Sequence, residues 1–128
     1  MQALLTRIIV FGQDIDQLKN FYTLNFNLTV TEETEHMWVV LNAGAVEIAL
    51  HRVGEAYLTT DKAGFKANSN TKLVFSIDTD LNLFRQKLIT KGVSMREIRS
   101  YAPNMLHCDG EDPEGNVFQL AWKITHTA

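Results

Sequence analysis

Residues 112–122 read Asp-Pro-Glu-Gly-Asn-Val-Phe-Gln-Leu-Ala-Trp, and this stretch decides the fold. Its first half predicts a turn, because Pro113 fixes φ at a value that β-turns use and Gly115 reverses the chain without steric penalty. Its second half alternates in the manner of a strand, with one face formed by Phe118, Leu120 and Trp122. Gln119 points to the opposite face between Val117 and Ala121, so it is the first residue that needs a functional explanation.

The length of 128 residues favours one domain, spanning residues 1–128. The net charge is −3 and the sequence has no basic cluster, which argues against a nucleic-acid partner. The single cysteine, Cys108, excludes an intramolecular disulfide and is typical of a reducing compartment. Because Arg7 interrupts the first apolar run and no cleavage-site pattern follows it, we expect a cytoplasmic protein without a membrane partner.

The first part of the chain predicts a strand, a helix and three more strands. The strand covers residues 4–11, and Asp14 with Gln17 predicts the start of a helix running to about Leu24. Further strands are expected at 28–32, 37–42 and 46–51, with an acidic turn at 32–35. A turn centred on Ala43-Gly44 would pair Val40 with Glu47 and Trp38 with Ala49. One face of that hairpin would then carry Trp38, Val40, Glu47, Ala49 and His51.

The pattern then repeats after a long loop. Residues 71–77 predict a strand, Thr79 or Asp80 caps a helix that ends near Gly92, and strands follow at 93–98, at 105–109 and in the opening stretch. Residues 6–10 align with 71–75, and 47–50 align with 117–120. We therefore expect module 1 at about 1–53, a linker at 54–70 and module 2 at about 71–125. A trough facing away from both helices would be the ligand site.

These residues resemble the vicinal oxygen chelate superfamily, which includes glyoxalase I, bleomycin-resistance proteins and extradiol dioxygenases. The resemblance rests on the Asp112-to-Leu120 motif, on Phe21-Tyr22, on residues 44–51 and on Ser76-Ile77-Asp78. It implies an α+β fold of two pseudo-symmetric βαβββ modules that form one eight-stranded concave sheet, with a helix backing each half. Members commonly pair, so we expect a homodimer.

In metal-using members, the resemblance places one ligand on the first strand and one on the last strand of each module. The matching positions here are Arg7, Ala49, Lys72 and Gln119. Arg cannot lose its proton, Ala has no donor atom and Lys would have to deprotonate beside a cation, so we expect no metal and no other cofactor. An off-register alternative would use Glu47, His51 and Gln119, with or without His107. Glu47 and His51 lie four residues apart on one strand, roughly 13 Å, which is too far to ligate one ion without a bulge.

The same positions indicate a ligand-binding cleft. Arg7 and Lys72 would bind an anion, Trp38 would stack on an aromatic ring, and Ala49 and Gln119 would line the wall. In the structural alternative, Glu47 pairs with one of the two cations, and one cation still exceeds the carboxylates on that face. Glu47 and His51 are the candidates for proton transfer. Cys108 is expected to be a small hydrophobic residue of the core or of the cleft wall, and Tyr101 to lie in a loop over the cleft mouth.

Three functions follow as hypotheses. The first is a metal-free protein that resembles the bleomycin-resistance branch and binds a small anionic or aromatic ligand. The second is a metal-dependent lyase, isomerase or dioxygenase of the same superfamily with an atypical site, so whether the protein is an enzyme stays open. The third is a fold kept for protein association. A cleft filled by its own side chains would favour the third, and an unpaired Arg7 or Lys72 would favour the first.

Overall fold

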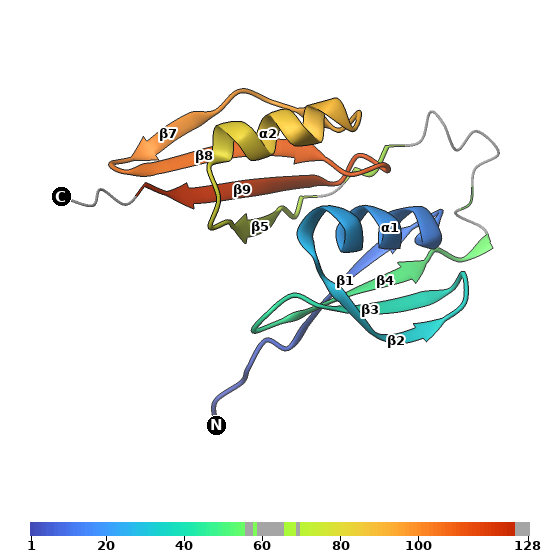
Figure 1. The fold of residues 1–128 in the computed structure, drawn as a ribbon. Helices are drawn as coiled ribbons and strands as arrows, with labels where there is room; N and C mark the ends of the chain where they lie inside the picture. The colour runs from blue at the N-terminus through green and yellow to red at the C-terminus, as the bar shows by residue number, and fades with distance from the viewer. Residues whose placement is uncertain (56–57, 59–65, 69, 125–128) are drawn as a thin grey trace. The chain divides into compact units, whose positions relative to one another are not determined.

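The computed structural model describes residues 1–55, 58, 66–68 and 70–124, and the chain divides into two units, Met1–Phe65 and Lys66–Ala128. The described residues form two helices and nine strands, in two mixed sheets, which confirms an α+β fold of two similar modules (Figure 1). Unit 1 contains β1 (Arg7–Gly12), α1 (Ile15–Phe26), β2 (Thr29–Thr34), β3 (Trp38–Asn42) and β4 (Glu47–Arg52). Unit 2 contains β5 (Leu73–Ser76), α2 (Leu81–Thr90), β6 (Ser94–Met95), β7 (Arg99–Ala102), β8 (Met105–Glu111) and β9 (Val117–Lys123).

Helix α1 begins where the sequence predicts it. The Asp14 side chain caps the helix by accepting a hydrogen bond from the Gln17 backbone N–H at 3.0 Å. The helix buries one stripe, formed by Ile15, Leu18, Phe21 and Tyr22, against strands β3 and β4. Those strands contribute the buried residues Val39, Leu41, Ile48 and Leu50, so this face of the sheet holds the core of unit 1.

The sheet of unit 1 has the strand order β1-β4-β3-β2, with β1 parallel to β4. The predicted hairpin register is wrong by two residues, because Val40 lies opposite Ala49 and Trp38 opposite His51. The turn is longer than predicted, since the Ala43 N–H bonds to the Val46 carbonyl at 3.1 Å. A shift of two residues preserves the side-chain alternation. The predicted face of Trp38, Val40, Glu47, Ala49 and His51 is therefore correct.

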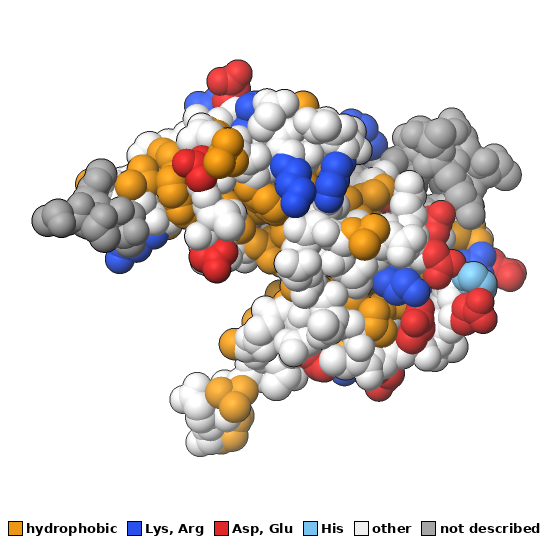
Figure 2. Space-filling model, viewed as in Figure 1, with side chains coloured by type: hydrophobic (Ala, Val, Ile, Leu, Met, Phe, Trp, Pro, Cys, Tyr) orange, Lys and Arg blue, Asp and Glu red, His pale blue; other side chains and the backbone are white. Residues whose placement is uncertain are grey.

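The turn between β2 and β3 carries a charged cluster that fastens it to α1. His36 adopts a left-handed φ of 65° and its ring pairs with Asp16 of α1. The second ring nitrogen of His36 lies 3.3 Å from a Glu35 carboxylate oxygen. Figure 2 shows acidic side chains gathered on the side of unit 1 where this turn lies in Figure 1. The predicted acidic turn is in part strand, because β2 continues to Thr34.

Unit 2 repeats this arrangement with one additional strand. Asp80 caps α2 by accepting bonds from the Asn82 and Leu83 backbone N–H groups, and the helix buries Leu81 and Leu88. The strand order is β5-β9-β8-β6, and β7 also pairs with β8. The single strand predicted at 93–98 is wrong, because β6 ends at Met95 and β7 begins at Arg99. Tyr101, predicted in a loop, lies on strand β7.

The alignment of the two modules is confirmed by strand pairing. Strand β1 pairs with β4 through Ile9 and Ala49, and β5 pairs with β9 through Val74 and Gln119. Each sheet has one face against its helix and one open face, on which Ile9, Phe11 and Val74 are 47%, 57% and 57% exposed. The single eight-stranded sheet across both modules stays a prediction, because each sheet is defined within its own unit.

The predicted linker at residues 54–70 lies largely outside the described residues. Its described end at residues 66–68 belongs to unit 2, where the Ala67 N–H donates to the Glu114 carbonyl at 2.6 Å. Lys66 also packs near Gly115. Within the described part of the chain, no helix has the length and hydropathy needed to cross a membrane.

Candidate functional site

The turn at residues 112–116 sets the direction of strand β9. One carboxylate oxygen of Asp112 accepts hydrogen bonds from the Glu114 and Asn116 backbone N–H groups, each at 2.9 Å. The other accepts from the Asn116 side-chain amide at 2.9 Å, and Gly115 adopts the φ of 83° that the turn requires. The strand then buries Phe118 and Leu120 completely. Gln119 is therefore directed to the open face.

Asp109 is the centre of the polar residues on that face. It lies on β8 directly opposite Gln119, whose side-chain N–H donates to the Asp109 carboxylate at 3.0 Å. Lys72 Nζ lies 2.8 Å from the other oxygen of Asp109, and Arg96 approaches the same oxygen at 3.7 Å. We call Lys72, Asp109 and Gln119 the Asp109 cluster. It brings together both residues that the sequence predicts as ligand-binding in module 2.

The surroundings of Asp109 favour its charged form. Burial by itself raises the pKa of this carboxyl, but the hydrogen bonds from Lys72 and Gln119 and the positive charges of Lys72 and Arg96 outweigh it. The pKa of Asp109 is consequently below its usual value. At neutral pH, Asp109 is an ionised acceptor of two hydrogen bonds, from Lys72 and Gln119, with the Arg96 charge nearby.

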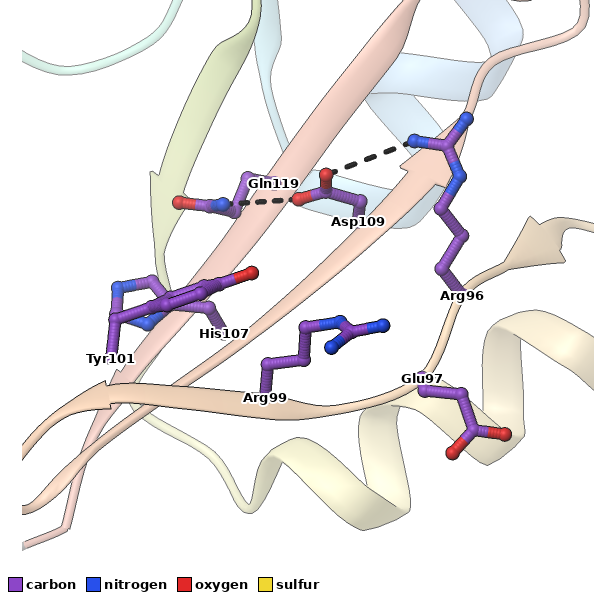
Figure 3. Close-up of a pocket in the computed structure, with 7 residues that line it drawn as sticks. All are labelled: Arg96, Glu97, Arg99, Tyr101, His107, Asp109 and Gln119. Carbon is purple, nitrogen blue, oxygen red and sulfur yellow. Dashed lines mark hydrogen bonds and ion pairs between the residues drawn. The ribbon is translucent and has the colours of Figure 1, made fainter.

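A pocket opens beside the Asp109 cluster, with about 270 Å³ of empty space that includes open solvent. Strands β8 and β9 supply His107, Asp109 and Gln119, and the β6–β7 segment supplies Arg96, Glu97, Arg99 and Tyr101. Figure 3 shows Gln119 and Asp109 across from Tyr101 and Arg99, while the Glu97 carboxylate points away from Arg99. All seven lining residues belong to unit 2.

The strand β7 side of the pocket combines a cation with two rings. Arg99 lies opposite His107 in the pairing of β7 with β8. The rings of Tyr101 and His107 have centroids 5.6 Å apart at an interplanar angle of 48°. His107 Nδ1 is buried and has no hydrogen-bond partner among the described residues. Arg99 was not a predicted site residue, because no strand was expected at β7, and Arg96 fell in the predicted strand at 93–98 without an assigned role.

In unit 1, the predicted residues Arg7, Trp38 and Glu47 meet on the open face of the sheet. The Arg7 guanidinium forms a salt bridge with Glu47 at 3.1 Å and lies 5.5 Å from the centre of the Trp38 ring. Trp38 also donates its indole N–H to Glu32 at 2.5 Å. Arg7 is thus already paired, as the structural alternative predicted for Glu47. The unit 1 surface has an aromatic face but no unpaired cation at Arg7.

His51 and Ala49 complete this face of unit 1. The His51 ring makes edge contacts with Phe11 and Trp38, at centroid distances of 5.3 and 5.6 Å. Its Nδ1 is buried without a hydrogen-bond partner in the described chain. Ala49 is fully buried, and its methyl side chain adds no polar group to this face. Convergence of these unit 1 residues with Lys72 and Gln119 stays a prediction.

The surplus cation expected on the cleft face is neither Arg7 nor Lys72. Arg7 pairs with Glu47, and Lys72 pairs with Asp109. Asp109 had no predicted role in the site. The alternation of residues 105–109 could have indicated Asp109 as a site residue, because it puts His107 and Asp109 on one face of a strand. Pairing Asp109 with Gln119 required the register of β8 on β9, which is a tertiary property.

The donor set does not fit the metal site that the resemblance implies. Arg7 and Lys72 are engaged as cations by Glu47 and Asp109, and Ala49 has no donor atom. In the part of the chain that the structure describes, no three His, Cys, Asp or Glu side chains group closely enough to hold a metal ion. The off-register alternative combines Glu47 and His51 of unit 1 with Gln119, and with or without His107, of unit 2, and it stays a prediction. No chemistry is therefore assigned to a metal here.

Cys108 belongs to the core, as predicted. Its side chain is 1% exposed, and the thiol donates to the Arg96 carbonyl at 3.0 Å. Burial raises the pKa of the thiol, which opposes formation of a reactive thiolate. Cys108 lies on the opposite side of β8 from His107, because successive strand residues alternate.

No family model matches the sequence, and no curated protein matches it. Solved structures do match over nearly the whole chain. Lactoylglutathione lyase from Agrobacterium tumefaciens aligns with a TM-score of 0.73 and 13% identity, covering 95% of each chain. The genomically encoded fosfomycin resistance protein FosX from Listeria monocytogenes aligns with a TM-score of 0.73 and 14% identity, covering 95% of this chain and 94% of that one.

An integron cassette protein from V. cholerae gives a TM-score of 0.69 at 22% identity, covering 95% of this chain and 96% of that chain. At such identities the similarity concerns the fold and leaves the chemistry open. The chain has the fold of the glyoxalase and fosfomycin-resistance proteins, the vicinal oxygen chelate fold that its Asp112-to-Leu120 motif led us to expect.

Proposed function

We propose that this protein binds a small anionic or aromatic molecule without a metal ion. The observation that carries the proposal is the unit 2 pocket, where Gln119 lines the same cavity as two arginines, a tyrosine and a histidine. Gln119 occupies the position from which the resemblance would take the closing metal ligand. Here its amide is bonded to Asp109 instead.

The charges around the pocket support an anionic ligand. Lys72 and Arg96 pair with Asp109 and with the nearby Glu111, the latter at 3.8 Å from Arg96, while the third carboxylate, Glu97, points away from Arg99 (Figure 3). An anion entering the pocket would therefore meet guanidinium groups without first displacing a free carboxylate. Lys72 contributes to ligand binding mainly by fixing the Asp109 carboxylate through their ion pair. In unit 1, Arg7, Trp38 and Ala49 supply the corresponding ligand surface.

Binding is better supported than proton transfer. The pocket lining contains no serine, threonine, cysteine or lysine to act as a nucleophile. Asp109 is a poor general base, because its hydrogen bonds to Lys72 and Gln119 lower its pKa. In unit 1, the Glu47 carboxylate is held by Arg7. Selective retention of a ligand requires none of these groups to change protonation.

The metal half of the proposal is tested by elemental analysis. Tag-free protein is exposed to Ni²⁺, Mn²⁺, Fe²⁺ and Zn²⁺, dialysed exhaustively and analysed, together with the variants Glu47→Ala and Gln119→Ala. We expect no near-stoichiometric metal in any of them. Metal that is retained by the wild type and lost in either variant would support the metal-dependent alternative and overturn this half of the proposal.

The ligand half is tested by a thermal-shift screen of carboxylates and aromatic compounds in the presence of a chelator. We expect a subset to raise the melting temperature of the wild type, and to raise that of Gln119→Ala less. Lys87→Ala is the matched control, because it removes an exposed charge on helix α2 outside the pocket. If no compound stabilises the wild type, the proposal fails.

A further inference from the structure

Among the described residues, the pocket of unit 2 contains one cation, Arg99, that no carboxylate neutralises. Lys72 lies 2.8 Å from Asp109, and Arg96 is shared between Asp109 and Glu111 at 3.7 and 3.8 Å. Arg99 forms no ion pair or side-chain hydrogen bond with any described residue, and the nearby Glu97 carboxylate points away from it (Figure 3). An anion in this pocket gains most by binding Arg99, because no existing pair must be broken.

The surface next to Arg99 is aromatic. Tyr101 follows two residues later on the same strand and is 72% exposed, and its ring neighbours that of His107. A large exposed ring beside an unpaired guanidinium suits a ligand that is both planar and charged. A small inorganic anion would use the guanidinium and leave the ring uncovered.

Gln119 supplies a hydrogen-bond acceptor to the pocket. Gln119 uses its amide N–H on Asp109, so its carbonyl oxygen remains available as an acceptor. His107 Nδ1 has no partner within the described residues, although it is buried. Because Nδ1 itself has almost no exposed surface, a ligand in the pocket does not reach it in this structure.

We propose that this pocket is selective for aromatic carboxylates. Arg99 binds the carboxylate through its two-pronged guanidinium, Tyr101 packs against the ring, and the Gln119 carbonyl accepts a hydrogen bond from a polar substituent. This inference rests on the proposed function, and it makes Arg99 the specificity-determining residue. Arg7 and Lys72, which the sequence singled out for this role, are held by Glu47 and Asp109.

The experiment measures binding of four probes by calorimetry: benzoate, its neutral amide benzamide, cyclohexanecarboxylate and inorganic phosphate. We expect benzoate to bind at least about tenfold more tightly than each of the other three, since the amide lacks the charge, the saturated ring lacks the flat face and phosphate lacks the ring. Hydroxy- and amino-benzoates are expected to bind more tightly than benzoate.

Three variants identify the residue responsible. Arg99→Ala is expected to weaken benzoate binding about tenfold or more, and Arg99→Lys to recover part of the loss, because lysine restores charge without the fork. Tyr101→Ala should weaken benzoate more than cyclohexanecarboxylate. Lys87→Ala, which removes a cation outside the pocket, should leave all four affinities unchanged.

The outcomes separate the two proposals. If benzoate binds equally well to the wild type and to Arg99→Ala, or if benzamide binds as tightly as benzoate, this inference is overturned while the proposed function stands. If none of the four probes, nor any compound of the wider screen, binds the wild type, the proposed function fails and this inference fails with it. Circular dichroism of each variant confirms that a lost affinity does not reflect a lost fold.

Discussion

Lys72 Nζ lies 2.8 Å from a carboxylate oxygen of Asp109. This ion pair determines which role Lys72 can have in the pocket. The resemblance places a metal ligand at this position. A lysine there whose charged ammonium group had no partner in the protein could bind an anion instead of a metal. The observed lysine does neither, because its charge is used within the protein. The free positive charge of the pocket lies instead on Arg99, at the edge that β7 adds to the sheet.

Replacement of Asp109 by Asn should lower the free energy of unfolding by about 1 kcal/mol or less at pH 7, because the Lys72 side chain is 44% exposed and solvent screens the pair. The pKa of Asp109 is lower in the folded protein than in the unfolded chain. Its stabilisation is therefore present above the unfolded value of about 3.9 and is lost as the pH falls through the folded value.

Urea unfolding of the wild type and Asp109→Asn between pH 7 and pH 2.5 measures this difference. The two curves should converge only at the acid end. Asp78→Asn is the control, since Asp78 is exposed and has no described ion-pair partner. A gap between wild type and Asp109→Asn that widens toward acid pH would contradict the assignment.

Gln119→Glu should destabilise the protein by about 1–2 kcal/mol at pH 7, because it puts a second carboxylate within hydrogen-bond distance of Asp109. The loss should shrink near pH 4, where one carboxyl group takes up a proton and donates to the other. Gln119→Met has nearly the same shape and no charge, so comparison with it isolates the repulsion. Equal stability of the two variants at pH 7 would refute this account of the Asp109 cluster.

Leu88→Ala should cost about 2–4 kcal/mol of unfolding free energy, because the Leu88 side chain is 1% exposed beneath the sheet that carries the pocket. Leu83 is on the same helix but 74% exposed, so Leu83→Ala should change stability by no more than about 0.5 kcal/mol. Chemical denaturation of both variants tests the orientation of α2. Similar losses for the two substitutions would show that the helix faces another way.

Asp16→Asn should lower the pKa of His36. The hydrogen bond to Asp16 raises that pKa above its usual value, with further contributions from the charges of Asp16 and Glu35. Because the folded value is the higher one, protonated His36 stabilises the fold below the unfolded pKa of about 6.5, and this contribution is lost as the pH rises through the folded value.

An NMR titration of the His36 ring protons measures the shift directly. Glu35→Gln should lower the pKa less than Asp16→Asn does, and the exposed Asp78→Asn should leave it unchanged. A His36 pKa that is the same in the wild type and in Asp16→Asn would mean that the turn does not rest on α1 in solution.

Local sequence signals predicted most elements because each depends on neighbouring residues alone. Asp14 and Asp80 cap their helices by bonding N–H groups two or three residues ahead. The Asp112 turn is closed by its own hydrogen bonds and delivers Gln119 to the open face. Alternation also assigned the correct face to Trp38 and His51, although their register was wrong, because a two-residue shift does not change a face.

Strand β7 was missed because its sequence lacks a strong apolar alternation. All four of its residues are exposed, so the strand is held by pairing with β8 rather than by burial. Because this strand was not predicted, Arg99 was not recognised as a pocket residue. For the same reason, Tyr101 was predicted in a loop, whereas it lies on β7 beside His107.

The sequence by itself determined the duplicated module, the helix boundaries, the faces of most strands and the resemblance that the structural comparisons support as a fold. Only the tertiary structure decided which charges neutralise one another. Ion pairing depends on register and on distances between strands far apart in sequence, as for Lys72 and Asp109, which are 37 residues apart. The pairing of Asp109 with Lys72 and Gln119, and the free guanidinium of Arg99, therefore emerged only when strands β5, β9, β8 and β7 were placed side by side.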